Sequence, residues 1–205
     1  MKKIKKLQEF LIKNNKKIII IEGLDCAGKE TLAKKIQAAT NGIIIDFPRY
    51  ETKLGKVIKD KLHSGNKEGI AELFEQDRKL FWKKDIFNIK EETIIFDRLH
   101  HCNLAYNEET SMKEEMWFRY LRLNDWVNCK VAFILREAKG KSRDLHESYI
   151  NKREVKDKNE TIEFQDKIND RYWNLIENKK IEFKSQDIIL QIGTDFDEMI
   201  KRILQ

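Results

Sequence analysis

The hydrophobic residues of this chain fall into five short, mostly β-branched runs. The runs occupy residues 17–22 (KIIIIE), 42–47 (GIIIDF), 93–97 (TIIFD), 130–135 (KVAFIL) and 187–192 (DIILQI). Continuous apolar runs of this length are typical of strands that are buried on both faces. We therefore predict five strands at these positions.

Between the runs, apolar residues recur at the three- and four-residue spacing of helices. The stripes are Leu32, Ile36 and Ala39; Leu54, Val57, Ile58 and Leu62; Ile70, Leu73, Phe74, Phe81 and Phe87; and Phe164, Ile168, Tyr172, Leu175 and Ile176. The third stripe indicates one long helix. Strands that alternate with helices predict a parallel sheet with right-handed crossovers, and such sheets bind ligands at the carboxyl ends of their strands.

The basic N-terminal segment also carries a helical pattern. Ile4, Leu7 and Leu11 share one face, which favours a short amphipathic helix packed on the domain over a transit peptide. We treat residues 1–15 as an N-terminal extension of a single domain that spans residues 1–205, a length that suits one domain.

Composition narrows the class of protein. Charged residues make up 37% of the chain and its net charge is +6, but lysines and glutamates are interspersed. This pattern favours a solvated surface that attracts anionic small molecules, and we expect no nucleic-acid partner. Cys26, Cys102 and Cys129 form no C-x-x-C motif and indicate reduced thiols, so we expect a cytoplasmic protein. No apolar run approaches the roughly eighteen residues that span a bilayer, so we expect no membrane partner.

Two features of the polar residues remain open. Residues 136–160 are highly charged and poor in large apolar side chains, so they form either an exposed helical excursion or a mobile flap, and they are our candidate lid. His63, His100, His101 and His146 show no metal-ligand spacing, and we interpret them as surface or helix residues.

The strongest local motif is IEGLDCAGKETL, residues 21–32. It matches the phosphate-loop pattern G-x-x-x-x-G-K at Gly23, Gly28 and Lys29, and it lies between a predicted strand and a predicted helix. Backbone N–H groups in such a turn, with the positive end of the helix, hold phosphate oxygens. We predict an ATP-phosphate site formed by Gly23, Leu24, Asp25, Cys26, Ala27, Gly28, Lys29, Glu30 and Thr31.

The motif departs from its pattern at Glu30, where a Ser or Thr hydroxyl usually binds magnesium. Thr31 cannot substitute, because one helical residue rotates the side chain by about 100°. A carboxylate also suits magnesium, which keeps several of its waters. We expect Mg²⁺ near Glu30, Asp25 and Asp97, with the alternative that Glu30 only caps the helix start.

Several segments together resemble the thymidylate kinases, which are P-loop nucleoside monophosphate kinases. They are EGLDCAGKETL (22–32), FPRY (47–50), ELFEQDR (72–78), FDRLHHCNLAYN (96–107) and KDKNETIEFQDKINDRYWNL (156–175), in family order. The resemblance implies an α/β fold of the P-loop NTPase type: a three-layer sandwich whose five-stranded parallel sheet is flanked by helices, with a mobile lid.

The resemblance also implies roles for individual residues. Arg98 would grip the acceptor phosphate, since a guanidinium makes two parallel hydrogen bonds to such a group. Asp25 would orient Arg98, the metal and the sugar. Phe74 and Arg78 share a helix face, where the ring would stack on the base and the guanidinium would bond its carbonyl edge. The remaining substrate-binding residues implied are Phe47, Pro48, Tyr50, Asn103 and Tyr106. A cis Phe47–Pro48 bond is also expected, as family members have one.

The departures from the family pattern bear on specificity and on the lid. Cys102 stands where Ser is frequent and Leu99 where an aromatic is frequent, which leaves the base preference open. Cys26 is neutral, and the chain resembles members that supply the catalytic cation from the lid. Our first candidate for that cation is Arg153 and our second is Arg143.

The function that the resemblance implies is transfer of the terminal phosphoryl of ATP to dTMP with Mg²⁺. The alternatives are a kinase for dUMP or a modified pyrimidine nucleotide, a deoxynucleoside kinase, and a nucleotide-binding regulator without catalysis. The family's habit of pairing through helices leads us to expect a homodimer that uses the helix over residues 70–87.

Overall fold

The computed structural model describes residues 2–66, 68–106, 128–137, 141–152, 161–178 and 186–205. The first lid candidate, Arg153, and the rest of residues 153–160 lie outside the described residues. Within the described ranges no helix is both long enough and apolar enough to cross a membrane.

Five parallel strands form one sheet in the order β2-β3-β1-β4-β5. They are β1 (Lys17–Gly23), β2 (Ile43–Asp46), β3 (Thr93–Asp97), β4 (Asn128–Leu135) and β5 (Ile188–Gln191). All five strand predictions are confirmed. The register pairs Ile21 with both Asp97 and Ala132, so the carboxyl ends of β1 and β3 lie side by side at the centre of the sheet.

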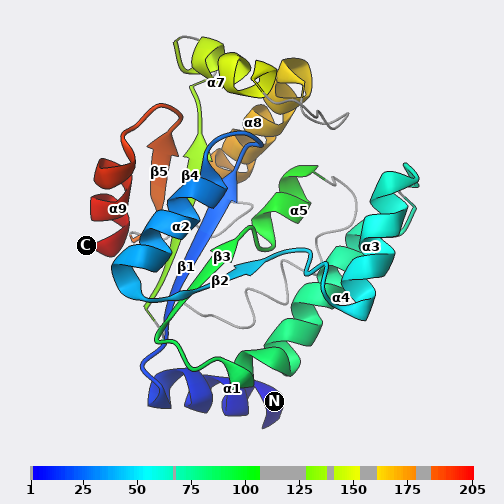
Figure 1. Cartoon of the computed structure of the whole chain (residues 1–205), viewed down its shortest axis with the longest axis vertical. Helices are drawn as coiled ribbons and strands as arrows, with labels where there is room; N and C mark the ends of the chain where they lie inside the picture. Colours follow the sequence, from blue (N-terminus) through cyan, green and yellow to red (C-terminus); the bar gives the residue numbers. More distant parts are fainter. Residues whose placement is uncertain (1, 67, 107–127, 138–140, 153–160, 179–185) are drawn as a thin grey trace.

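Helices surround the sheet (Figure 1). They are α1 (Lys2–Lys13), α2 (Lys29–Thr40), α3 (Lys53–His63), α4 (Ile70–Lys83), the 3-10 helix η1 (Asp85–Asn88), α5 (His101–Tyr106), α7 (Lys141–Asn151), α8 (Ile162–Glu177) and α9 (Phe196–Leu204). In Figure 1, α2 crosses the front of the sheet and α8 lies behind it. The sheet thus forms the middle layer of an α/β sandwich of the P-loop NTPase type, as predicted.

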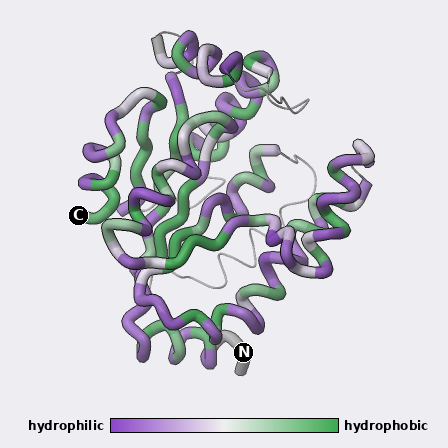
Figure 2. Tube along the Cα trace, viewed as in Figure 1, coloured by the Kyte–Doolittle hydropathy of each residue, from purple (hydrophilic) through white to green (hydrophobic). Residues whose placement is uncertain are grey.

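The core is the hydrophobic sheet, which Figure 2 shows as a green centre within more polar helices. Its largest contribution comes from the isoleucines of β1, together with Ile94, Ile95 and Phe96 of β3, all almost fully buried. Leu7 and Leu11 of α1 join this core, which confirms that the N-terminal helix packs on the domain.

The predicted long helix over residues 70–87 is wrong at its end. α4 ends at Lys83, Lys84 leaves the helical region with φ −138° and ψ −59°, and η1 follows. Tertiary contacts explain the break: Asp85 pairs with Arg49 at 2.5 Å, and Phe87 packs edge-on against Phe10 of α1 at 5.1 Å between ring centroids.

The interpretation of the histidines as surface or helix residues is wrong only for His100, which is buried between β3 and α5. His63, His101 and His146 lie in α3, α5 and α7, but His101 and His146 are buried rather than exposed. The reason is tertiary: α5 packs against α8, and α7 lies over the end of the sheet that carries the phosphate loop.

A buried ion pair joins the loop after β2 to α4. The guanidinium of Arg49 contacts Asp77 through Nε (3.0 Å) and Nη2 (2.7 Å), and the Arg49 N–H donates to the same carboxylate at 2.8 Å. Asp77 is completely buried, and Arg49 lies over the rings of Phe47 and Phe81. This pair holds the FPRY segment in place beside the site.

We expect Asp77→Ala to lower the free energy of unfolding by about 3–5 kcal/mol, because the change leaves the buried charge of Arg49 without its principal partner. Urea denaturation followed by circular dichroism measures the loss. Asp60→Ala, on the exposed face of α3, is the matched control and should change stability by less than about 0.5 kcal/mol. Equal effects of the two substitutions would contradict this role.

Candidate functional site

The turn between β1 and α2 has the geometry of a phosphate-binding loop. Gly23 (φ 131°) and Gly28 (φ 85°) take conformations that favour glycine, and Cys26 is left-handed at φ 58°. A Cβ on Gly23 would lie 2.1 Å from the Ile134 carbonyl oxygen, so no other residue fits there. Gly28 provides no side-chain cap, and the first N–H groups of α2 are therefore available to an anion.

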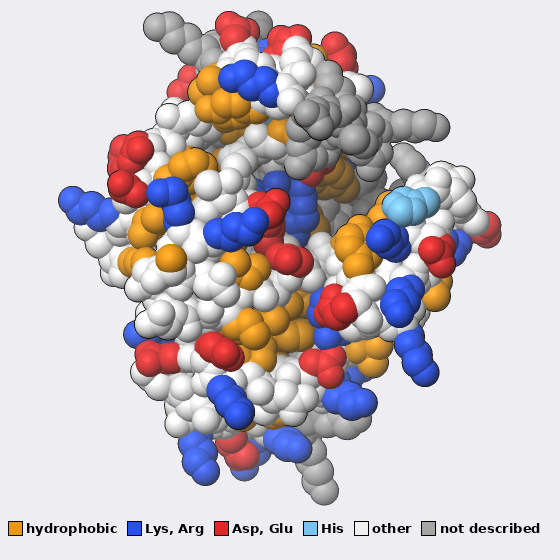
Figure 3. Space-filling model, viewed as in Figure 1, with side chains coloured by type: hydrophobic (Ala, Val, Ile, Leu, Met, Phe, Trp, Pro, Cys, Tyr) orange, Lys and Arg blue, Asp and Glu red, His pale blue; other side chains and the backbone are white. Residues whose placement is uncertain are grey.

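A cavity of about 440 Å³ opens over this loop. Its lining comprises Asp25, Cys26, Ala27, Gly28, Lys29, Glu30, Thr31, Asp46, Phe47, Asp97, Arg98 and Tyr149. Figure 3 shows lysine or arginine and acidic side chains gathered at the hollow in the centre of this face. Of the nine predicted ATP-binding residues, Asp25 to Thr31 belong to this lining, and Gly23 and Leu24 do not. The predicted residues Arg98, Asp97 and Phe47 are also brought to this cavity, whereas Asp46 and Tyr149 were not predicted.

Lys29 is the buried cation of the cavity. Its side chain curls back so that Nζ donates to the Leu24 carbonyl oxygen. Burial, reinforced by the positive charge of Arg98, lowers the pKa of Lys29 to about 8, and Asp25, Asp97 and Glu22 oppose the change. The ammonium therefore lies among competing charges, and a phosphate group in the cavity would stabilise its charged form.

Arg98 faces Lys29 from the end of β3. It has a left-handed backbone (φ 69°), and its N–H donates to Ile21 O at 2.9 Å. Its guanidinium donates to Gly23 O at 3.2 Å, forms an ion pair with Asp25, and lies 5.2 Å from the ring centroid of Tyr106. The neighbouring charge of Asp25 keeps the pKa of Arg98 well above its ordinary value despite burial.

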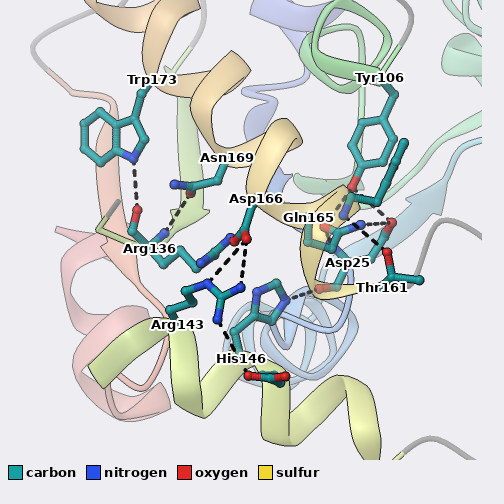
Figure 4. A network of polar contacts seen from close by, with 12 residues as sticks. Asp25, Tyr106, Arg136, Arg143, His146, Thr161, Gln165, Asp166, Asn169 and Trp173 are labelled. Carbon is teal, nitrogen blue, oxygen red and sulfur yellow. Dashed lines mark hydrogen bonds and ion pairs between the residues drawn. The ribbon is translucent and has the colours of Figure 1, made fainter. Parts of the chain in front are cut away.

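The carboxylate, the N–H and the carbonyl oxygen of Asp25 all take part in hydrogen bonds with other residues (Figure 4). Its carboxylate accepts from Arg98, from Tyr106 Oη at 3.0 Å and from Gln165 Nε2 at 3.0 Å. Its N–H donates to Gln165 Oε1 at 2.9 Å, and its carbonyl oxygen lies 2.6 Å from Nε2 of His146. Burial acts to raise the pKa of Asp25, but the charges of Arg98 and Lys29 and these hydrogen bonds lower it.

Sequence reasoning missed Gln165, His146 and Glu22. Gln165 lies within a segment that resembles the family, but no role was assigned to it. Glu22 is fully buried at the end of β1, where Oε1 accepts from the Leu99 N–H (2.9 Å) and Oε2 from Tyr172 Oη (3.3 Å). A carboxylate at the end of an otherwise apolar strand was the available signal, and Glu22 holds the turn that carries Arg98.

The predicted base pocket lies beside the cavity rather than in its lining. Arg78 on α4 and Asn103 on α5 are buried, and Asn103 Nδ2 donates to Ala71 O at 3.4 Å, so the two helices meet there. Phe74 is half-buried and Tyr50 is exposed. Burial, together with the charges of His101 and Arg78, lowers the pKa of His100 well below its ordinary value. The Phe47–Pro48 bond is cis, as predicted.

The three carboxylates expected near magnesium do not converge. Asp25 is bound to Arg98, and Glu30 is largely exposed and paired with Lys34 at 2.5 Å. Among the described residues, no three His, Cys, Asp or Glu side chains form a metal-binding group. Asp97 remains, with Asp46 paired beside it in register; burial and the neighbouring acidic groups raise both pKa values. A cation held by Asp97 together with phosphate oxygens would relieve this repulsion.

Within the candidate lid, residues 141–151 form the helix α7, whose His146 and Ile150 are buried. Arg143 does not line the cavity; it pairs with Asp166 at 2.9 Å and with Glu147 at 3.7 Å. Arg136 is buried at the end of β4 and also pairs with Asp166. The side chain that α7 contributes to the cavity is Tyr149.

The solved structures most useful for comparison agree on the fold. Thymidylate kinase from Candida albicans superposes with a TM-score of 0.65 at 20% identity, over 93% of this chain and 90% of that chain. Deoxyadenosine kinase from M. mycoides with bound dATP superposes with a TM-score of 0.58 at 18% identity, over 92% and 97% of the chains. At these identities the likeness concerns the fold alone.

Sequence comparisons identify the family to which the chain belongs. A "Probable thymidylate kinase" of Methanococcus maripaludis strain S2 is 28% identical over 195 residues, 92% of this chain and 93% of the relative. One of Methanococcus aeolicus strain Nankai-3 is 27% identical over 200 residues, 92% and 94% of the chains. The family model for thymidylate kinase matches residues 21–196, from the phosphate loop to α9. With its phosphate loop and Arg98 at one cavity, this chain belongs to the thymidylate kinase family of phosphotransferases.

Proposed function

We propose that this protein transfers the terminal phosphoryl group of ATP to dTMP. The observation that carries the proposal is that Lys29, at the start of α2, and Arg98, directly after β3, line the same cavity. The phosphate loop and Lys29 bind the donor phosphates, and Arg98 binds the acceptor phosphate. The two substrates then meet in line over the loop.

The chain's own residues supply positioning and charge. Direct transfer needs no covalent intermediate, and bringing both phosphates together with their charges neutralised provides the catalysis. Asp25 holds the guanidinium of Arg98 at the cavity, which limits the reorganisation needed when the acceptor arrives. Arg78, Asn103 and Phe74 bind the base, and Tyr50 lies on the sugar side.

Mg²⁺ completes the proposed site. Asp97, which lines the cavity, would be its protein ligand, and phosphate oxygens and water would complete its coordination. When bound, the ion shields the charge of the transferring phosphoryl group.

Arg153 remains the proposed transfer cation of the lid, because Arg143 is paired with Asp166.

We also propose a cytoplasmic homodimer. Its interface would use α4 and α3, where Leu80, Val57 and Leu62 expose apolar surface, and sedimentation would detect a species of twice 24.6 kDa.

A deoxynucleoside kinase is the second candidate. Its chemistry needs a carboxylate base for a hydroxyl group, and Asp46 lines the cavity with a pKa that burial and Asp97 raise. The acceptor therefore decides between the two: a monophosphate for the first function and a nucleoside for the second.

A coupled assay with ATP and Mg²⁺ tests these functions. The acceptors are dTMP, dUMP, dCMP, dAMP, dGMP and UMP, together with thymidine and deoxyadenosine. We expect the highest kcat/KM for dTMP and no phosphorylation of the nucleosides. Phosphorylation of a nucleoside with no turnover of monophosphates would replace the proposal by the second candidate. Binding of ATP with no turnover of any acceptor would indicate a regulator.

A further inference from the structure

The lid helix α7 is attached to the phosphate loop through a buried histidine. Nε2 of His146 lies 2.6 Å from the carbonyl oxygen of Asp25, and the side chain of His146 is 0% exposed (Figure 4). The two residues are 121 positions apart in the chain. The contact therefore exists only because α7 folds over the carboxyl end of the sheet.

The chemistry of this contact assigns the proton. A carbonyl oxygen only accepts, so Nε2 of His146 must carry the hydrogen. Nδ1 is buried and makes no hydrogen bond within the described part of the chain. A second proton on Nδ1 would therefore be desolvated without an acceptor, which favours a neutral ring protonated on Nε2.

The polar groups of Asp25 are held from several parts of the fold, and α7 supplies a contact to one of them. Gln165 of α8 holds its N–H, and Arg98, Tyr106 and Gln165 hold its carboxylate. Only the carbonyl oxygen is held by α7. Loss of His146 would thus release one peptide group of the loop and leave the anchorage of Arg98 in place.

That peptide group also contains the N–H of Cys26. Because the peptide unit is planar and trans, its C=O and N–H point in opposite directions. A carbonyl fixed toward His146 therefore fixes the direction of the Cys26 N–H on the other side of the loop. Cys26 lines the cavity and has a left-handed backbone, so this orientation needs support from its surroundings.

The same contact places α7 itself. His146 and Ile150 are one turn apart on the buried face of α7, and Tyr149 beside them lines the cavity. Leu145 packs on the loop after β5: a Cβ added to Gly193 would lie 2.7 Å from Leu145 Cδ2. The hydrogen bond of His146 thus links α7 to the phosphate loop through polar atoms.

We propose that His146 is a positioning residue whose Nε2–H donates to the Asp25 carbonyl and thereby directs the Cys26 N–H toward the donor phosphates and seats Tyr149 at the cavity. This inference rests on the proposed function, because it assigns the phosphate loop to ATP. It predicts that His146 supports binding of the donor and leaves binding of the acceptor almost unchanged.

The first test needs no nucleotide. Long-range ¹H–¹⁵N NMR spectra of the full-length protein at neutral pH report which ring nitrogen carries the proton. We expect His146 to show a neutral ring protonated on Nε2, and His146→Gln identifies its signal. A ring protonated on Nδ1 would overturn the proposal whether or not the protein uses ATP and dTMP.

The second test compares variants by calorimetry with ATP and with dTMP separately. H146Q keeps an N–H donor at a similar reach, and H146F fills similar volume without a donor. We expect H146F to weaken ATP binding about 5- to 10-fold, as for one lost hydrogen bond, and H146Q to stay within about 2-fold of the wild type. Binding of dTMP should change by less than about 2-fold in both variants.

Controls separate this role from packing and from the proposed function. His63→Phe makes the same substitution at an exposed histidine and should leave both affinities unchanged. If H146F does not fold, H146N, whose amide is too short to reach Asp25, takes its place. Equal ATP affinities of H146Q and the donor-less variant would refute positioning, as would an equal loss of ATP and dTMP binding. If the wild type binds neither nucleotide, the proposed function fails and the role in donor binding fails with it, while the NMR result still decides whether Nε2–H of His146 donates to Asp25.

Discussion

Lys29→Met is expected to lower kcat by about 10²–10³-fold, the range found when one preorganised group that stabilises the transition state is removed. Lys29 is the buried cation over the phosphate loop, and its partner is a carbonyl oxygen that it can exchange for a phosphate. Methionine retains most of the side-chain length and removes the charge. Single-turnover kinetics with saturating ATP and dTMP measure the chemical step directly.

The fold should survive this substitution. The lowered pKa of Lys29, about 8, means that burial disfavours its charge in the protein without nucleotide. Removing that charge therefore relieves a desolvation cost, and the melting temperature should not fall substantially. Lys35→Met, on the exposed side of α2, is the matched control and should keep the wild-type rate. A Lys29→Met protein with near wild-type turnover would show that the loop does not bind the donor.

Arg98→Gln is expected to weaken dTMP binding by about 2–5 kcal/mol while ATP binding changes much less. The guanidinium lies at the cavity among Asp25, Gly23 and Tyr106, and it is the cation best placed for an acceptor phosphate. Arg98 has a left-handed backbone, which glycine adopts more easily than other residues. Glutamine, like arginine, carries a Cβ, so the two proteins share the same backbone strain and differ only in the charge and shape of the side chain. Calorimetry with each nucleotide separates the two effects.

The control for Arg98 is Arg202→Gln on α9. Arg202 is exposed, and its Nη2 donates to Ile189 O at 3.1 Å, away from the cavity lining. This variant should bind both nucleotides as the wild type does. If Arg98→Gln weakens ATP and dTMP equally, Arg98 serves the donor as well, and the assignment of the two sides of the cavity is wrong.

The sequence by itself determined the features whose cause is local. The five strands were predictable because each contains a short apolar run rich in isoleucine or valine, which favours a strand within a parallel sheet. The phosphate loop was predictable because its glycine spacing reflects a local backbone requirement: Gly23 and Gly28 take the positive φ values that favour glycine. Leu7 and Leu11 identified α1 through their shared face in the same way. In each case the pattern and its physical reason lie within a few residues.

Only the tertiary structure decided which polar groups meet. Gln165 reaches Asp25 from 140 positions away, and His146 from 121, because the crossovers of a parallel sheet bring α7 and α8 over the end of β1. The end of α4 at Lys83 and the pairing of Arg143 with Asp166 depend in the same way on partners in other elements. A buried polar side chain must find a hydrogen-bond partner, but its own sequence neighbours do not specify which one. The local pattern therefore located the cavity, and the fold chose the residues that hold its cations in place.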